Sequence, residues 1–214
     1  MYYSPNLDYL YPCSGVAITI RHILTPAHCV IWKPQRDYRF RTKNKIHPIS
    51  QIFIHPKYTL DRSDNNIAIL QLEGDLNMAS GLSLAEDVDP GSLIARRFDV
   101  VTLGQGKSGT RSHRTTKITS QAYCQRKFEG LAITELEVCA HIPTDSPVLA
   151  GSPLVGIKME NGTGACNLLG ISLHGLAKNN PQMPTLFALI STHRQWIEEI
   201  TSYNYTKSSI QRES

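Results

Sequence analysis

The stretch that decides the fold lies early in the chain and reads Leu24-Thr25-Pro26-Ala27-His28-Cys29. It belongs to one of many short apolar runs, most of them four to eight residues long and broken by Gly, Pro, Asn or Asp. Runs of this kind, with frequent turn signals and no helical segments alternating between them, are typical of strands in antiparallel sheets. We therefore predict an all-β fold, either a barrel or a sandwich.

The end of the chain has a different pattern. Ser191 or Thr192 can cap a helix whose apolar positions Trp196, Ile197 and Ile200 fall on one face. The residues after this segment are polar, so we expect a frayed tail.

Composition excludes several classes of function. Hydrophobic residues make up 41% of the 214 residues, as in a soluble globular protein, and no apolar run approaches the ~20 residues of a membrane-spanning helix. The net charge of +4 is mild, whereas nucleic-acid binding needs basic residues gathered on one face. We identify one basic cluster, interpreted as a solvated loop, with a site for an acidic partner as the alternative. It contains Lys107, Arg111, Arg114 and Lys117, with His113 beside them.

The five cysteines are Cys13, Cys29, Cys124, Cys139 and Cys166. None forms a CxxC motif and nearby histidines complete no zinc pattern, so we expect no metal and no other cofactor. Residues 13–29 and 124–139 form loops of similar size that disulfides could close, although the sequence leaves the pairing open. The fifth cysteine is interpreted as a small buried apolar residue, with a bridge to another chain as the alternative.

Seven segments together resemble the chymotrypsin-like (trypsin family) serine proteases over about residues 9–200. The histidine motif at residues 24–29, and the interval from Cys13 to Cys29, match that family with one change at Pro26. The other matching segments are Ile54-His55-Pro56-Lys57-Tyr58, Asp64-Asn65-Asn66-Ile67-Ala68-Ile69-Leu70, Gly104-Gln105-Gly106, Gly151-Ser152-Pro153-Leu154-Val155, Leu169-Gly170-Ile171-Ser172 and Trp196-Ile197.

This resemblance implies two packed antiparallel β-barrels of the six-stranded type, with the active site between them, a C-terminal helix, and secretion. We expect one trypsin-like domain over residues 1–203, followed by a polar tail over 204–214. The first barrel would cover about 9–90, the second about 91–190 and the helix about 191–202, with the first strand missing or altered. The resemblance also implies the disulfides Cys13–Cys29 and Cys124–Cys139.

The family's catalytic residues match this sequence at one position of three. His28 stands where the family has its histidine, but Asn66 replaces the aspartate and Ala150 replaces the nucleophilic serine. An amide cannot stabilise an imidazolium as a carboxylate does, and a methyl group cannot form an acyl-enzyme. We therefore interpret His28 as vestigial. The alternative is a triad rebuilt from Asp64 and Ser152, which requires two coordinated backbone shifts.

The resemblance also points to changes around the catalytic positions. Leu149 replaces the aspartate that receives the new amino terminus on activation, and Val148 replaces a glycine of the oxyanion hole. Four residues fall on the specificity pocket, where Thr185 is expected to fill the cavity wall. They are Thr144, Asp145, His174 and Thr185.

The resulting prediction is a secreted serine protease homologue that does not catalyse and acts by binding protein, such as the inactive homologues common among arthropods. Its partners would be proteases or inhibitors, and not nucleic acid. The alternative is an active serine endopeptidase with a rebuilt triad, and a third reading is a poorly folding gene product. Sequons at Asn161 and Asn204 predict glycosylation.

Overall fold

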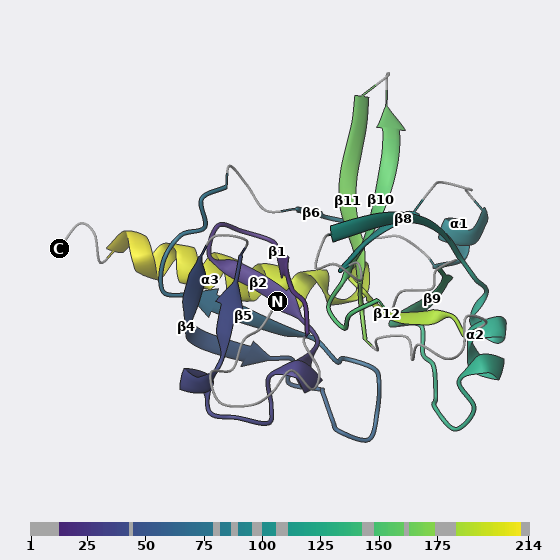
Figure 1. The fold of residues 1–214 in the computed structure, drawn as a ribbon, viewed down its shortest axis with the longest axis horizontal. Helices are drawn as coiled ribbons and strands as arrows, with labels where there is room; N and C mark the ends of the chain where they lie inside the picture. Colours follow the sequence, from purple (N-terminus) through teal and green to yellow (C-terminus); the bar gives the residue numbers. More distant parts are fainter. Residues whose placement is uncertain are drawn as a thin grey trace.

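The computed structural model has the all-β architecture that the sequence predicts, with a helix at the C-terminus (Figure 1). It describes residues 13–42, 45–78, 82–86, 90–95, 100–105, 111–142, 148–160, 163–173 and 183–210. Two curled sheets lie side by side, the first built from the N-terminal part of the chain and the second mainly from the C-terminal part.

The first sheet has five strands in the order β1-β2-β5-β4-β3 within the described part of the chain. Every pairing between its neighbours is antiparallel. The strands are β1 (Val16–Ala17), β2 (His22–Thr25), β3 (Arg39–Arg41), β4 (Ile46–Ile54) and β5 (Ala68–Leu72).

The second sheet has the order β10-β7-β8-β9-β12-β11-β6, and β10 also pairs with β11. That additional pairing closes six of its strands into a barrel, as expected. The seventh strand, β6, comes from the segment between the sheets and pairs in parallel with β11. The strands are β6 (Ser83–Leu84), β7 (Val100–Gln105), β8 (Arg111–Ile118), β9 (Glu137–His141), β10 (Pro153–Glu160), β11 (Thr163–Ser172) and β12 (Thr185–Leu189).

Helices are few and mostly short. The 3₁₀ turns are η1 (Ala27–Cys29), η2 (Gln35–Asp37) and η3 (Ser191–His193), and the α-helices are α1 (Pro90–Ala95), α2 (Gln121–Lys127) and α3 (Arg194–Ile210). Among the described residues, no helix has the length and apolar character needed to cross a membrane.

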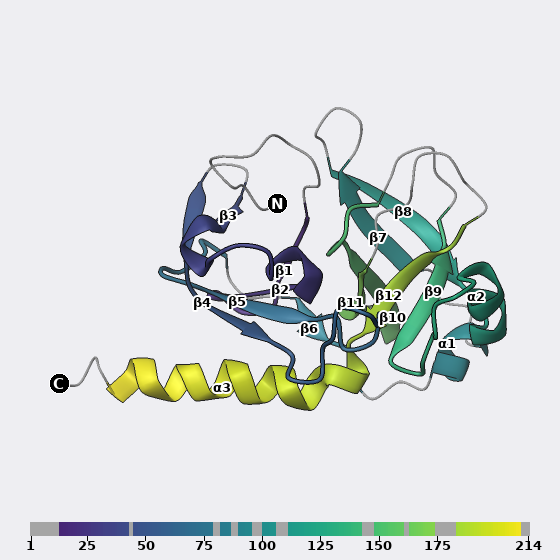
Figure 2. The same ribbon diagram turned by 90° about the horizontal axis from the view of Figure 1, so that it is seen from below.

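The long helix α3 runs along the outside of the first sheet (Figure 2). Its apolar face is the predicted one, because Ile197 is fully buried and Trp196 and Ile200 pack beside it. The helix begins at 194 after a 3₁₀ turn and continues to 210. The expected helix range of 191–202 was therefore too short, and the tail was expected to begin too early in the chain. No Gly or Pro interrupts this segment, so nothing in the sequence ends the helix at 202.

The side chain of Thr192 does not cap this helix. Its hydroxyl donates instead to the carbonyl of Leu189, at 2.8 Å. No side-chain cap is present on η3 either, since Ile190 is its N-cap residue. The predicted cap is therefore wrong, and the chain enters α3 through a continuous 3₁₀ turn.

One apolar cluster joins the two sheets to the helix. It contains Leu24 and Ile69 of the first sheet, Leu168 and Leu186 of the second, and Ile197 of α3. All five side chains are fully buried. The two sheets and α3 therefore share one hydrophobic core, in addition to a separate core within each sheet.

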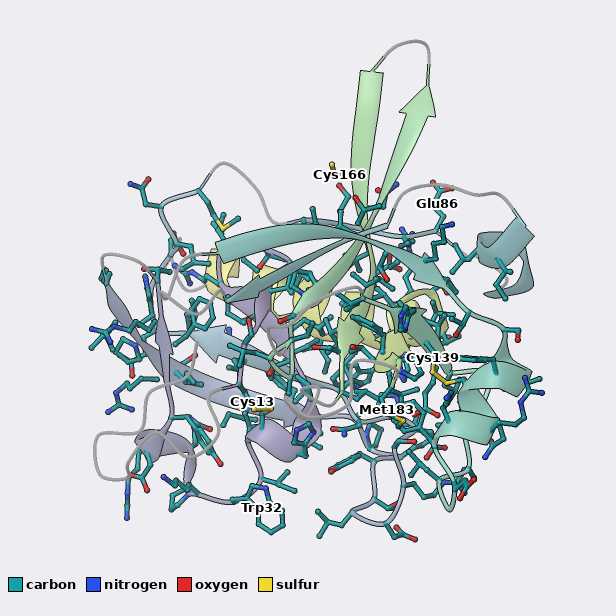
Figure 3. The ribbon with its side chains drawn as sticks, turned by 45° about the vertical axis from the view of Figure 1, so that its right-hand side comes forward. Cys13, Trp32, Glu86, Cys139, Cys166 and Met183 are labelled. Atoms are coloured by element: carbon teal, nitrogen blue, oxygen red, sulfur yellow. A yellow bond between two sulfur atoms is a disulfide. The ribbon has the colours of Figure 1, made fainter. Side chains whose placement is uncertain are left out.

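The disulfides pair as the resemblance implies. Cys13 is bonded to Cys29, and Cys124 to Cys139. Cys166 is free but exposed, so the expectation of a small buried residue was wrong. It lies on β11 where the β10–β11 hairpin leaves the barrel (Figure 3). Strand alternation places every second side chain of this strand outside the barrel.

Truncation of Ile197 tests the shared core. We expect Ile197→Ala to lower the free energy of unfolding by about 2–5 kcal/mol, because it leaves a cavity between helix and sheets. Glu199→Ala, at an exposed position of the same helix, is the control and should change stability by about 0.5 kcal/mol or less. Chemical denaturation measures both, and equal effects would contradict the packing described.

Two histidines under α3 make stability depend on pH. The ring centroids of His55 and His193 are 5.4 Å apart, and His55 also meets Trp196 edge-on at 5.0 Å. Burial lowers the pKa of His55 from 6.5 to about 4, with smaller contributions from His193 and Lys57. Burial also lowers the pKa of His193.

Because the folded pKa lies below the unfolded one, the unfolded chain takes up protons first as pH falls. We expect stability to decrease from pH 6.5 down to about pH 4, and this contribution to level off below that. His55→Phe keeps an aromatic ring and should make the decrease shallower. Thermal unfolding of both proteins across this range measures the effect, and an unchanged slope in the variant would contradict it.

Candidate functional site

Strand register brings His28 next to Asn66. His28 lies in η1 directly after β2, and Asn66 lies just before β5. These strands are antiparallel neighbours with Thr25 opposite Ala68, so the end of one meets the start of the other. Asn65, whose φ of 55° is left-handed, forms the turn that presents Asn66, and asparagine tolerates that conformation.

Asn66 holds His28 by both its backbone and its ring. The Oδ1 atom of Asn66 accepts a hydrogen bond from the His28 backbone N–H at 3.0 Å. The Nδ1 atom of the ring lies 3.2 Å from Oδ1 and 3.0 Å from Nδ2 of the same amide. Asn66 is 3% exposed, so these contacts are sheltered from water.

The chemistry of an amide differs from that of a carboxylate at this position. A carboxylate can only accept, so it selects the imidazole with a proton on Nδ1. The Asn66 amide can accept from Nδ1–H through Oδ1 or donate to a bare Nδ1 through Nδ2, and it carries no charge. The pair therefore orients the ring of His28 without fixing its tautomer.

Ala150 lies in a tight turn that four hydrogen bonds hold. Its carbonyl accepts from the backbone N–H of Ser14 at 2.6 Å. The backbone N–H of the next residue, Gly151, donates to the carbonyl of Ser172 at 2.7 Å. The backbone N–H of Ser152 donates to the carbonyl of Leu149 at 3.0 Å. The hydroxyl of Ser172 donates to the same Leu149 carbonyl at 2.6 Å.

Gly151 is required by this turn. Its φ of 84° is left-handed, and a Cβ atom there would lie 1.9 Å from the carbonyl oxygen of Ser14. Any other residue would push the Ala150 turn away from Ser14. The close approach of the Ser14 carbonyl therefore explains why this position of the motif is a glycine.

One disulfide connects the two parts of the site. Cys29 follows His28 directly, and its partner Cys13 precedes Ser14, whose N–H reaches Ala150. The hydroxyl of Thr25 also donates to the Ser14 carbonyl, at 3.0 Å. Sequence reasoning identified His28, Asn66 and Ala150 but missed the supporting roles of Ser14 and Ser172. Two sequence features could have suggested these roles. Ser14 directly follows a disulfide cysteine, and Ser172 ends one of the segments that match the family.

The residues considered for a rebuilt triad have other surroundings. Both carboxylate oxygens of Asp64 accept from the guanidinium of Arg62, at 2.8 and 2.9 Å. Ser152 is 1% exposed, between the Ala150 turn and β11. Asp64 is thus paired with an arginine, and the Ser152 side chain is closed to solvent.

The specificity-pocket residues are described only in part. Thr185 lies on β12 opposite Ala140 and is 1% exposed. Its hydroxyl has no hydrogen-bond partner among the described residues. Thr144, Asp145 and His174 lie outside the described residues, as does Asn161, and the side chain of Asn204 on α3 is not described. Their roles, and that of Thr185 as a filled pocket wall, stay predictions.

One group of potential metal ligands occurs within the described ranges, formed by Cys13, His28 and Cys29. The two cysteine sulfurs are bonded to each other, which leaves His28 as the single ligand of the group. One imidazole does not make a metal site.

Comparison with known proteins gives the family. The family model described as trypsin matches residues 3–197. The chain is 26% identical to the vitellin-degrading protease of Bombyx mori over 206 residues, covering 87% of this chain and 75% of the relative. It is 25% identical to chymotrypsin-C of Bos taurus, covering 87% of this chain and 77% of the relative. With trypsin Tyr p 3.0101 of Tyrophagus putrescentiae the identity is 25%, over 87% and 70% of the two chains.

The chain therefore belongs to the trypsin family of serine endopeptidases, as its sequence motifs predicted. Asn66 and Ala150, which the sequence places at the aspartate and serine positions of the motif, each take part in a hydrogen bond with backbone groups of another segment.

Substitution of Asn66 tests how far it supports the His28 turn. We expect Asn66→Ala to destabilise the fold by about 1–3 kcal/mol, because the buried N–H of His28 loses its acceptor. Gln51→Ala, on the exposed side of β4, should change stability by about 0.5 kcal/mol or less. Equal unfolding midpoints for the two variants in a urea titration would show that Asn66 does not carry this role.

Proposed function

We propose that this member of the trypsin family is secreted, does not cleave peptides, and acts by binding other proteins. The observation that carries the proposal is the residue at the constrained turn beside Gly151, which is Ala150. Its methyl group has no lone pair to attack a carbonyl and no proton to transfer to His28. Substrate bound there would therefore meet no nucleophile.

The residue at position 66 supports the same conclusion. In an enzyme of this family, exchange of the aspartate for asparagine alone lowers kcat about 10⁴-fold. Asn66 stands at that position and contacts His28 through an uncharged amide. Without the aspartate, the base His28 lacks electrostatic support, and without the serine the site lacks a nucleophile.

Secretion is supported by the cysteines. Two disulfides close the loops at Cys13–Cys29 and Cys124–Cys139, and such bonds persist in oxidising compartments. Glycosylation at Asn161 and Asn204 would follow from the same location. The binding partner is proposed to be a protease or an inhibitor, since this scaffold presents its loops to protein chains.

The competing proposal is an active endopeptidase, and the named relatives that are proteases favour it. In such an enzyme the candidate nucleophile is Ser152, whose side chain is 1% exposed. Burial of that side chain argues against it.

A fluorophosphonate probe, which labels activated serines covalently, separates the two proposals. We expect no labelling of the folded protein and no hydrolysis of peptide esters. The double variant Asn66→Asp/Ala150→Ser restores the two missing groups and serves as the matched comparison, with trypsin as the positive control. Stoichiometric labelling of the unaltered chain at any serine would overturn the non-catalytic proposal. Labelling of the double variant alone would attribute inactivity to these two positions.

A further inference from the structure

The densest basic segment of the chain is not the one that sequence analysis selected. Residues 33–45 contain six lysines and arginines and one acidic residue, Asp37. Their net charge of +5 exceeds the +4 of the whole chain, so the remainder is slightly acidic. The view that residues 107–117 form the one basic cluster was therefore wrong. The segment went unnoticed because apolar and aromatic residues separate its charges.

The fold places these charges on the outer side of the first sheet. Strand β3 is at the edge of that sheet, and its middle residue, Phe40, is 7% exposed and packs into the core. Alternation along the strand turns Arg39 and Arg41 to the opposite side. We call this region the β3 basic surface; it comprises Lys33, Arg36, Arg39, Arg41 and Lys45.

Hydrogen bonds bring two of the arginines together. One guanidinium nitrogen of Arg39 donates to the carbonyls of Arg36 and Tyr38, the latter at 2.8 Å. The Arg39 head therefore lies against η2, next to the exposed Arg36. Two arginines held near each other raise the local positive potential, which attracts and steers an anionic partner.

Apolar side chains flank the charges at both ends. Trp32 is 70% exposed and Ile46 is 45% exposed. The buried Tyr38 holds the loop that carries Trp32 in place. Its hydroxyl accepts hydrogen bonds from the backbone N–H groups of Trp32 and Lys33, at 3.1 and 3.0 Å. The indole points away from the barrel (Figure 3). It is thus a large apolar group on a fixed support.

We infer that the β3 basic surface, with Trp32 and Ile46, binds an acidic protein segment that also carries apolar side chains. Tryptophan and arginine are enriched among the residues that contribute most to protein interfaces. A sulfated polysaccharide could satisfy the charges but would leave the exposed aliphatic group without a partner, and binding to an anionic membrane is an outcome that the test below distinguishes. The inference goes beyond the proposed function and does not depend on it, since the surface includes neither His28 nor Asn66.

Fluorescence anisotropy with a labelled peptide of repeated Glu-Glu-Phe units tests the inference directly. We expect saturable binding that weakens as salt rises from about 50 to 200 mM, because screening reduces the charge attraction. A Glu-Glu-Ser peptide, which keeps the charges, and a Ser-Ser-Phe peptide, which keeps the aromatic groups, should each bind at least about tenfold more weakly.

Two charge-reversal variants locate the site. Arg36→Glu/Arg41→Glu should reduce affinity for the Glu-Glu-Phe peptide at least about tenfold. Lys117→Glu/Arg126→Glu changes net charge equally at exposed positions of the second barrel and should alter affinity less than about threefold. Trp32→Ser, a change at an exposed side chain, should also weaken binding at least about fivefold. Thermal unfolding of each variant checks that it is folded.

Several outcomes would overturn the inference. Equal losses in the two charge-reversal variants would indicate general attraction to a basic protein. Equal binding of the Glu-Glu-Ser and Glu-Glu-Phe peptides would remove the role of apolar contacts. Tighter binding of a heparin oligosaccharide or of phosphatidylserine vesicles, lost in Arg36→Glu/Arg41→Glu, would assign the surface to a glycan or a membrane. Peptide binding and fluorophosphonate labelling are independent measurements, so failure of one does not imply failure of the other.

Discussion

The backbone hydrogen bond from Ser14 to Ala150 ties the second barrel to the disulfide that also secures the His28 turn. The Cys13–Cys29 bond fixes the residue before Ser14, and the Thr25 hydroxyl holds the Ser14 carbonyl, so both support the contact between the Ala150 turn and the first sheet. Gly151 has to be glycine for the same reason, since a side chain would occupy the space of the Ser14 carbonyl. The geometry of the candidate site therefore depends on a covalent link near the start of the described chain.

This well-connected frame contrasts with the groups that it holds. The amide of Asn66 keeps His28 in place with well-formed hydrogen bonds, yet it supplies no charge. Ala150 stands in a turn held on both sides, yet it supplies no nucleophile. A scaffold of this kind can still present loops and surfaces to a partner. The β3 basic surface, on the same sheet as the strands beside His28, is the binding surface that we infer.

The packing of α3 illustrates a second constraint. The helix covers the first sheet, while its preceding turn follows directly from β12 of the second barrel (Figure 2). Ile197 fills the space where both sheets meet, and His193 is buried beside it with its Nδ1 atom 2.7 Å from the carbonyl of Leu189. Burial lowers the pKa of both His193 and His55, which favours their neutral forms in the folded protein.

The sequence by itself determined the strand-rich architecture, the apolar face of α3, the family and the identities of Asn66 and Ala150. These follow from periodicity and from motifs, which are local properties of the chain. The extent of α3 was misjudged because polar residues are compatible with both a helix and a frayed end, and exposed Cys166 was misjudged because burial depends on strand orientation. The folded structure was needed to show that Asn66 meets His28 and that Ser14 holds Ala150. Strand register and a disulfide bring these groups together across long stretches of chain, and no local pattern encodes such distances.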